Sequence, residues 1–439
     1  MVSLEKLYSI FRQHPTVCTD SRRITPGCLF FALKGEKFDG NRFVGQALAN
    51  GAAFAVADAP PADLAASPQC LRVPDVLDAL QHLATYHRRQ FDIPVIAIGG
   101  SNGKTTTKEL VTAVLSSHYP CHSTKGNLNN HIGVPLTLLD MPMDTEVAIV
   151  EMGTNRAGDI EQLCEIAAPT HGLLTNIGKE HLEGFGNLQG VKKAEGELFE
   201  YLARHHGCAF VNASEKYLKT MSRSLSKRVF YQASEKLKPQ DQVIDVQLLP
   251  GAPFVQVAFL SEDNRQVEIR SRLIGRHNFQ NIMTAVALGV YFKVPAAKIK
   301  AAIEQYEPKN NRSQLLTKGG NTIFLDAYNA NPSSMRAALE TLRSMPAGQK
   351  VAILGDMLEL GAESEREHRD ILRFASRLRL DRLVIVGPEF ARCAGASKNV
   401  LHFPDALSTK EWLDKQAFHD AFILIKASRG IGLERVVAD

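Results

Sequence analysis

The amino-acid sequence predicts an α/β fold of three domains, on three observations. The chain has 439 residues, which is enough for two to four domains with ample cores. Within residues 93–110 an apolar run leads through a glycine loop into a helix, which is typical of a parallel sheet. From about residue 310, apolar strands alternate with helices, which indicates a Rossmann-like, doubly wound domain.

Composition excludes several classes of protein. Hydrophobic residues make up 44% of the chain and charged residues 22%, as in a soluble globular protein. The net charge of +4 is spread thinly, so we expect no nucleic-acid partner. There is no apolar run of about 18 residues, so we expect no membrane insertion, and no signal peptide is evident. Seven scattered cysteines without a C-x-x-C pair indicate reduced thiols and a cytoplasmic location.

We place the domain boundaries at 1–88, 89–308 and 309–439. In the first, small α/β domain, a turn at 26–28 leads into an apolar strand. Asp20, Ser21, Arg22 and Lys34 could surround an anionic ligand there. Taken alone, such residues are more often caps and turn residues.

The stretch GGSNGKTTTKEL in the central domain predicts a phosphate-binding loop. Loop N–H groups and the positive end of the following helix would face a phosphate. Lys104 would reach the terminal phosphates, and the Thr105 hydroxyl would face a magnesium ion. The eight-residue pattern would require glycine at Ile98, so the loop is a shorter form, G-x-x-G-K-T from Gly100. The alternative is an ordinary glycine turn before a helix.

Polar residues follow the other strands of the predicted central sheet. Glu151 ends the strand 146–153, and His181 lies in the loop of 171–187. Ligands bind at the carboxyl ends of strands in open α/β sheets, so Glu151 could meet a metal held by phosphates. The segment GNLNNHIGVP suits a loop that binds something polar, although a surface turn fits it about as well. Asn278 and Asn281 would share one face of a helix and could cap it or contact a base.

The last domain carries strands at 321–327, 350–356, 382–387 and 421–427 and helices at 333–345, 364–378 and 432–437. It lacks the G-x-G-x-x-G pattern, so we do not expect a dinucleotide there. Its strand-end polar residues are Asp326, Asn329, Asn331, Asp356 and Lys426.

A nucleotide domain between two flanking domains suits the activation of a carboxylate. Phosphorylation turns the carboxylate into an acyl phosphate with a good leaving group, and an amine can then attack it. Positioning and charge neutralisation would carry most of the catalysis. No Ser/His/Asp triad or zinc spacing competes with this interpretation.

Nine motifs, in order along the whole chain, resemble those of the Mur ligases of peptidoglycan synthesis: TDSRRITPGCLFFALKGEKFDG, GSNGKTTTKE, GNLNNHIGVP, EMGTNRAGDI, NIGKEHLEGFG, GRHNFQN, LDAYNANPSSM, LGDMLELG and IKASRG. The closest resemblance is to the members that join D-alanyl-D-alanine to UDP-N-acetylmuramoyl-tripeptide. It implies an ATP-dependent amide ligase that uses Mg²⁺ and an acyl phosphate, gives UDP-N-acetylmuramoyl-pentapeptide, ADP and phosphate, and is a cytoplasmic monomer.

The resemblance also implies residue roles. The UDP-sugar substrate would contact Thr19, Asp20, Ser21, Arg22, Lys34 and Asp39, and further substrate contacts would come from Asn127, Asn129, Asn130, Tyr328 and Asn331. ATP would contact Gly100, Ser101, Asn102, Gly103, Lys104, Thr105, Thr106, Asn278, Asn281, Arg312, Asp326 and Asn329. Magnesium would be held by Thr105, Glu151, His181 and Glu195, and the catalytic set would be Lys104, Glu151, His181, Glu195 and Arg312. The C-terminal domain would close on the central one when ligands bind, about a hinge near 308–312.

Two positions depart from the family pattern. Glu195 stands where most members carry a lysine that forms a carbamate and holds a second magnesium. Our hypothesis is that the Glu195 carboxylate keeps this charge and reaches the metal directly or through water. The rival is Lys192, three residues earlier on the same helix face, which could be carbamylated instead. Asn41 stands where members often have His, which leaves that substrate contact open.

Two other functions compete with this reading. A sister amide ligase, adding the third stem residue or glutamate on folate, would share the central motifs, but the D-N-P-R run of the diaminopimelate-adding sister is absent. A nucleotide switch would need N-K-x-D, which is also absent. The sequence leaves the third stem residue open between diaminopimelate and lysine.

Overall fold

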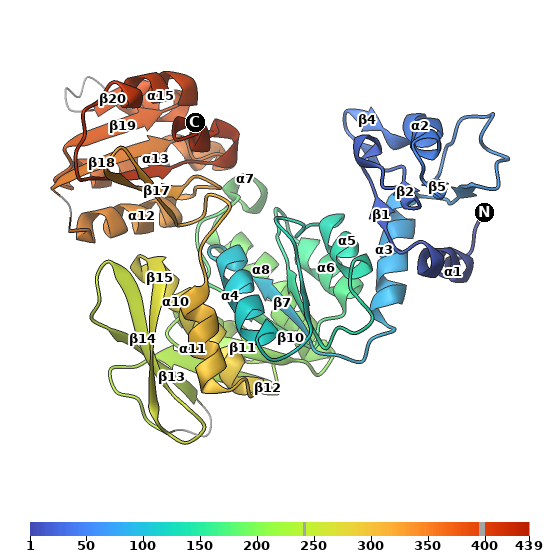
Figure 1. The fold of residues 1–439 in the computed structure, drawn as a ribbon, viewed down its shortest axis with the longest axis horizontal. Helices are drawn as coiled ribbons and strands as arrows, with labels where there is room; N and C mark the ends of the chain where they lie inside the picture. The colour runs from blue at the N-terminus through green and yellow to red at the C-terminus, as the bar shows by residue number, and fades with distance from the viewer. Residues whose placement is uncertain (240–242, 347, 395–399, 439) are drawn as a thin grey trace.

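The computed structural model describes residues 1–239, 243–346, 348–394 and 400–438, which form three sheet-centred regions along the chain (Figure 1). The N-terminal region carries a four-stranded sheet, the central region a nine-stranded sheet and the C-terminal region a six-stranded sheet. Within the described part of the chain, no helix has the length and apolar character needed to cross a membrane. The predicted α/β class with three sheets in sequence order is confirmed.

The N-terminal sheet is parallel, in the order β1-β2-β5-β6, with a separate β3-β4 hairpin. Its helix α1 begins where the Ser3 hydroxyl accepts the N–H of Lys6, and it buries Leu7 and Phe11. The elements are α1 (Leu4–Gln13), β1 (Val17–Cys18), η1 (Ser21–Arg23), β2 (Leu29–Phe31), β3 (Lys34–Gly35), β4 (Phe38–Asp39), η2 (Gly40–Phe43), α2 (Val44–Ala49), β5 (Phe54–Ala57), β6 (Cys70–Arg72) and α3 (Val76–Arg88).

The central sheet has the order β15-β14-β13-β12-β11-β10-β7-β9-β8. Its strands are parallel from β8 to β13, as predicted around the glycine loop, whereas β14 runs antiparallel to both β13 and β15, and these three strands lie together at one end of the sheet (Figure 1). The elements are β7 (Val95–Gly99), α4 (Lys104–Ser116), β8 (Cys121–Ser123), α5 (Gly133–Leu139), β9 (Val147–Glu151), α6 (Asp159–Ala167), β10 (His171–Leu174), α7 (Leu182–Phe185), α8 (Leu188–Arg204), β11 (Cys208–Asn212), α9 (Lys216–Met221), β12 (Lys227–Ala233), β13 (Val243–Leu249), β14 (Phe254–Leu260), β15 (Gln266–Ile274), α10 (Arg276–Tyr291) and α11 (Ala296–Gln305).

The C-terminal sheet has the order β16-β17-β21-β18-β19-β20, and the four predicted strands are its parallel centre. The sequence analysis did not predict two edge strands: β16, antiparallel to β17, and β20. Both are short and half exposed, so neither shows a continuous apolar run. The elements are β16 (Gln314–Lys318), β17 (Asn321–Asp326), α12 (Pro332–Ser344), β18 (Gln349–Gly355), η3 (Gly361–Glu363), α13 (Ser364–Ser376), β19 (Arg382–Val386), α14 (Pro388–Ala394), β20 (Val400–Phe403), α15 (Ala406–Asp414), β21 (Ala421–Lys426), η4 (Arg429–Ile431) and η5 (Leu433–Val436).

The helix predicted at 432–437 is wrong in type. The structure has two 3₁₀ turns there, η4 and η5, joined at Gly432, which has a φ of +69°. A left-handed residue cannot continue an α-helix, and so short a segment forms few i→i−4 hydrogen bonds.

The N-terminal and central regions share one hydrophobic core. A single cluster of buried side chains runs from Leu7 and Phe11 of α1, through Leu80 of α3, to Leu138 of α5. Arg88, at the end of α3, is buried and donates hydrogen bonds to the carbonyls of Phe91, Ala167 and Ala168. These contacts fix α3 against the central region on either side of the boundary that the sequence suggested.

Candidate active site

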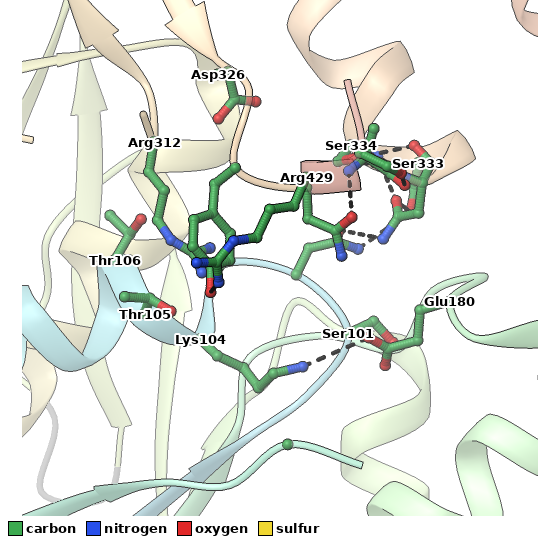
Figure 2. Close-up of a pocket in the computed structure, with 18 of the residues that line it drawn as sticks. Ser101, Lys104, Thr105, Thr106, Glu180, Arg312, Asp326, Ser333, Ser334 and Arg429 are labelled. Atoms are coloured by element: carbon green, nitrogen blue, oxygen red, sulfur yellow. Dashed lines mark hydrogen bonds and ion pairs between the residues drawn. The ribbon is translucent and has the colours of Figure 1, made fainter. Parts of the chain in front are cut away.

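A polar cavity of about 560 Å³ lies between the central and C-terminal regions, and residues of both line it. The central region contributes the glycine loop, the end of β9 and the start of α10. The C-terminal region contributes the loops after β17 and β21 and the start of α12. Figure 2 shows Lys104, Thr105 and Thr106 facing Arg312, Asp326 and Arg429 across this space.

The glycine loop joins β7 to α4, as the sequence predicted. Gly100 has a φ of +108°, and a Cβ there would lie 2.4 Å from Thr175 Oγ1. Gly103 has a φ of +82°, and a Cβ there would lie 2.6 Å from Asn281 Oδ1. Both the backbone conformation and the close neighbours therefore require glycine. The turn brings the N-terminus of α4, with its free N–H groups, to the cavity.

Lys104 is folded against its own loop. Its Nζ donates to the Gly100 carbonyl at 2.5 Å and lies 3.5 Å from Glu180 Oε2 (Figure 2). Burial opposes the charge of this ammonium group, but the carboxylates of Glu180, Glu195 and Glu151 outweigh that effect and raise the Lys104 pKa. Lys104 therefore stays charged beside the loop that is shaped to hold an anion.

Glu151 and Thr105 form an oxygen-rich corner next to this loop. Glu151 Oε1 accepts the Thr105 hydroxyl at 3.0 Å and the Asn129 side-chain amide at 2.8 Å. Glu151 is 1% exposed, and its Oε2 has no hydrogen-bond partner among the described residues, with Lys108 Nζ 4.0 Å away. A buried carboxylate oxygen with spare acceptor capacity, beside a hydroxyl and a phosphate loop, suits a magnesium ion.

Glu195 lies beneath the glycine loop rather than on the cavity wall. It is fully buried in α8, and its Oε2 accepts the Gly100 N–H at 2.7 Å. Burial, with a smaller contribution from Glu180, raises the Glu195 pKa to about 8, although the Lys104 charge opposes this. Lys192, the alternative in the sequence analysis, places its ammonium 3.5 Å from the centre of the Tyr217 ring.

His181 lines the same cavity as the glycine loop. Its Nδ1 lies 2.8 Å from Glu359 Oε2, and this hydrogen bond lowers the Glu359 pKa. Among the residues that the structure describes, no three His, Cys, Asp or Glu side chains gather closely enough to hold one metal ion. Thr105 and Glu151 are thus together, whereas His181 and Glu195 are not brought into one cluster with them.

The residues assigned to ATP by the resemblance lie around the cavity. Asn278 and Asn281 are buried at the start of α10, where Asn281 Nδ2 donates to Asn278 Oδ1 and Asn281 Oδ1 accepts the Thr107 hydroxyl. Arg312 stacks on the ring of Tyr328, 3.6 Å from its centre. The assigned residues that line the cavity are Ser101, Asn102, Gly103, Lys104, Thr105, Thr106, Asn278, Asn281, Arg312, Asp326 and Asn329; Gly100 is not among the lining residues.

The residues assigned to the other substrates fall into two places. Asn127, Asn129, Tyr328 and Asn331 line the cavity, whereas Asn130 caps the start of α5 by accepting the N–H groups of Ile132 and Gly133. The remaining assigned residues lie in the N-terminal region, outside the cavity: Thr19, Asp20, Ser21, Arg22, Lys34 and Asp39.

Two ion pairs occur in that N-terminal set: Asp20 pairs with Arg22 at 2.8 Å, and Lys34 pairs with Asp58 at 2.9 Å. Asn41, the smaller departure from the family pattern, is buried. Its amide donates to Asp39 and Asp58, and its oxygen accepts the Ala59 N–H. Asn41 therefore holds the loop of Asp39 in place.

The C-terminal region contacts the glycine loop directly. Asn331, the N-cap of α12, donates to Asn102 Oδ1 at 2.8 Å, and Asn102 donates to the Ser333 hydroxyl at 3.1 Å. Lys179 pairs with Glu367 at 2.5 Å. The structure holds one arrangement of the regions, so closure upon ligand binding stays a prediction.

The sequence analysis missed His277 and Arg429 as cavity residues, and it named Lys426 only as a strand-end residue without a role in the site. His277 is neutral at ordinary pH because burial lowers its pKa, and its Nε2 faces the Ser313 hydroxyl at 3.3 Å. Lys426 pairs with Asp326 at 2.6 Å. The signal was present, since His277 lies inside GRHNFQN and the other two inside IKASRG, but we took each motif without assigning these members a role.

The fold and the cavity define a class: a three-region α/β protein whose phosphate loop faces a second Rossmann-like sheet across a polar cavity. Family models agree. Residues 16–88 match the Mur ligase family catalytic domain, 98–289 the Mur ligase middle domain, and 311–429 the Mur ligase glutamate ligase domain. The chain belongs to the Mur ligase family.

Individual relatives and solved structures show which members of the family the chain is similar to. The chain is 37% identical to the UDP-N-acetylmuramoyl-tripeptide--D-alanyl-D-alanine ligase of Escherichia coli and 35% to that of Bacillus subtilis, in both cases over 96% of this chain and 92% of the relative. A crystal structure of MurF from Acinetobacter baumannii matches with a TM-score of 0.85 and 31% identity, over 97% and 92% of the two chains. A MurF ligase from Thermotoga maritima in complex with ADP matches with a TM-score of 0.84 and 25% identity, over 100% and 97%.

Proposed function

We propose that this protein is an ATP-dependent ligase that joins D-alanyl-D-alanine to UDP-N-acetylmuramoyl-tripeptide in cytoplasmic peptidoglycan precursor synthesis. The observation that carries the proposal is the cavity, where a phosphate loop of one region faces the strand-end loops of another. The relatives of the same name match over nearly the whole chain, which supports the choice of substrates. We propose a monomer as the working form.

Each region has a role in this proposal. Residues 1–88 bind the UDP-sugar end of the nucleotide substrate, residues 89–308 bind ATP and carry the phosphate loop, and residues 309–439 bind the dipeptide. The shared core of α1, α3 and α5 supports this division, because it fixes the first two sites relative to each other. The Asn102–Asn331 contact supports a dipeptide site that adjoins the phosphates.

The first chemical step is the attack of the tripeptide carboxylate on the terminal phosphorus of ATP, with ADP leaving. Both reactants are anions, so the site must offset their repulsion. Lys104, the loop N–H groups and Arg312 supply positive charge on the cavity wall. In the second step the neutral dipeptide amine attacks the acyl carbon, the acyl C–O bond breaks and inorganic phosphate leaves. The nitrogen loses one proton to the departing phosphate or to solvent and keeps the other as the amide N–H.

A magnesium ion fits beside the loop. Thr105 and Glu151 would hold it, because Glu151 Oε2 has spare acceptor capacity and Glu151 Oε1 already bonds to the Thr105 hydroxyl. When bound, the ion would neutralise charge on the phosphates and polarise their oxygens. Asn129 orients Glu151, and Glu195 supports the loop from behind through Gly100. A second ion at His181 and Glu195 gains no such support, because Glu195 lies beneath the loop and the described residues do not bring these side chains into one cluster.

Phosphate release tests the proposal. Release should require ATP, UDP-N-acetylmuramoyl-tripeptide and D-alanyl-D-alanine together, and chelation of Mg²⁺ should abolish it. Running the assay with tripeptides ending in diaminopimelate and in lysine identifies the third stem residue. Turnover with ATP alone, or with glutamate and folate, would overturn the proposal.

A further inference from the structure

Two arginines in the cavity have no carboxylate to neutralise them. Lys104 faces Glu180, Lys426 pairs with Asp326, and His181 bonds to Glu359. By contrast, neither Arg312 nor Arg429 forms an ion pair with a carboxylate among the described residues. Both line the cavity, so the free positive charge of its wall is concentrated in these two side chains.

The two arginines share one aromatic ring. The Arg312 guanidinium lies 3.6 Å from the centre of the Tyr328 ring, and that of Arg429 lies 5.3 Å from it. Arg429 Nη1 also donates to the Tyr328 hydroxyl at 3.4 Å. Figure 2 shows the side chains of Arg312 and Arg429 converging from opposite sides. An aromatic face attracts a cation, so Tyr328 lets two like charges approach each other.

The two guanidinium groups repel each other at this distance, and bound anions would offset that repulsion. A guanidinium presents a planar fork of N–H groups that matches a carboxylate or a phosphate. Arg312 follows α11 at the junction of the two regions, and the family resemblance assigns it to the phosphates of ATP. Arg429 instead begins η4, three residues after the end of β21, and is exposed while lining the cavity.

The proposed reaction supplies a third anion besides the phosphates and the stem peptide. The incoming dipeptide ends in a carboxylate, which must come to rest about 7 Å from the amine that attacks, the span of two extended residues. A negative charge that close to an acyl phosphate is repelled unless a cation offsets it. Lys426, the other cation on the same strand end, is already occupied by Asp326.

We propose that Arg429, held by Tyr328, binds the C-terminal carboxylate of the incoming dipeptide and so selects acceptors with a free carboxyl end. This inference rests on the proposed ligase function and assigns a specificity-determining residue to it. Arg429 is the cation that the C-terminal region contributes to the acceptor, and Arg312 is the cation at the phosphates.

The test compares two acceptors, D-alanyl-D-alanine and its C-terminal amide, in the phosphate-release assay with the full-length protein. We expect the unmodified protein to prefer the free acid in kcat/KM by about 10- to 100-fold, the range for a hydrogen bond between charged groups. Arg429→Ala should raise KM for the free acid by a similar factor and leave KM for the amide nearly unchanged. Arg429→Lys should fall between the two proteins, because it keeps the charge and loses the fork.

Arg435→Ala is the matched control, because Arg435 is an exposed arginine in the same terminal segment that does not line the cavity. Both Arg429→Ala and Arg429→Gln should unfold at the same temperature as the unmodified protein, and Arg429→Gln replaces Arg429→Ala in the assay if only the alanine variant is destabilised. Equal preference for acid and amide in the unmodified protein would overturn the inference while leaving the ligase function intact. A raised KM for ATP, with the acid still preferred in Arg429→Ala, would place Arg429 at the phosphates and overturn it too. Failure of the ligase function itself appears earlier, as no release by the unmodified protein.

Discussion

The ion pair between Lys426, which is buried, and Asp326, whose side chain is 18% exposed, gives the sharpest stability prediction. Lys426 is 1% exposed, and its Nζ lies 2.6 Å from Asp326 Oδ2 and donates to the Asn329 carbonyl at 3.0 Å. The pair therefore ties the end of β21 to the loop after β17, which carries Tyr328 and Asn329 into the cavity. Replacing Lys426 with Met leaves the Asp326 carboxylate with the Ser313 N–H, at 3.1 Å, as its remaining donor from the hydrogen bonds described.

The expected loss in the free energy of unfolding follows from the distance between the Lys426 and Asp326 charges. At an effective dielectric constant of about 20, two unit charges 2.6 Å apart attract by about 6 kcal/mol, most of which offsets the cost of removing them from water. Breaking such a pair from one side costs about 3–5 kcal/mol, because one charge stays buried without its partner. We expect that loss for Lys426→Met. The double variant Lys426→Met/Asp326→Asn should recover most of it, because no buried charge remains.

The single tryptophan makes the assay specific to the C-terminal region. Trp412 lies on α15 and packs against Phe403 and Phe418, with ring centres 5.7 and 6.1 Å away, so its fluorescence in urea follows the unfolding of this region. Lys410→Met is the control, because the Lys410–Asp414 pair is partly exposed and 3.9 Å long, and we expect it to change stability by less than about 1 kcal/mol. If Lys426→Met costs no more than this control, or if the double variant is no more stable than the single one, the reasoning is refuted.

The same pair sets a dependence on pH. Burial opposes ionisation of Asp326, but the Lys426 charge outweighs it and lowers the Asp326 pKa below the ordinary 3.8. A depressed carboxyl pKa contributes stability above the unfolded pKa, and that stability is lost as the pH falls through the folded pKa. The Trp412 unfolding midpoint should therefore drop more steeply below about pH 4 in the unmodified protein than in the double variant. Parallel curves would contradict this assignment.

Three further predictions concern other positions. Glu195→Ala should lose activity, because the buried N–H of Gly100 loses its hydrogen-bond acceptor, which costs about 1–3 kcal/mol of stability in the loop. Lys192→Ala should stay active, and the intact mass of the protein should show no carbamate. A fully active Glu195→Ala would exclude our hypothesis for Glu195. Glu151→Gln should lower kcat/KM at least about 100-fold and raise the Mg²⁺ concentration needed, with unchanged thermal unfolding; an unchanged Mg²⁺ requirement would remove Glu151 from the metal site. Asn41→Ala should destabilise the N-terminal region by about 1–2 kcal/mol in thermal unfolding, because the buried Asn41 side chain loses its partly buried hydrogen bonds to Asp39, Asp58 and the Ala59 N–H; a change no larger than that of exposed Arg42→Ala would contradict this.

Local patterns made most of the fold predictable. The loop from β7 to α4 could be read from the sequence because a strand, two left-handed glycines and a helix start are consecutive residues. The parallel strands of the C-terminal sheet are buried on both faces and therefore form continuous apolar runs. The edge strand β16 is exposed along half its length, so its pattern resembles that of a loop.

Site residues could be predicted only where two interacting residues lie in one segment of the chain, or where the family resemblance supplied their roles. The pairing of Arg312 with Arg429 over Tyr328 joins segments 117 residues apart along the chain, from 312 to 429, and no spacing rule reaches that far. Glu195 was expected at a metal because it stands where most members of the resembled family carry a carbamylated lysine. The structure instead places its oxygen on the Gly100 N–H, a contact that depends on how deeply α8 packs below the loop.

The shared core of the N-terminal and central regions has a consequence for which substrates fit. Because α1, α3 and α5 pack into one cluster and Arg88 fastens the end of α3, the distance from the UDP-sugar site to the phosphate loop is fixed. Under the proposed assignment of these two sites, the fixed distance selects substrates by length. The nucleotide binds at the UDP-sugar site, and only a stem peptide of the matching length brings its carboxylate to the phosphate loop. Selection by length would then need no contact with the side chains of the intervening residues.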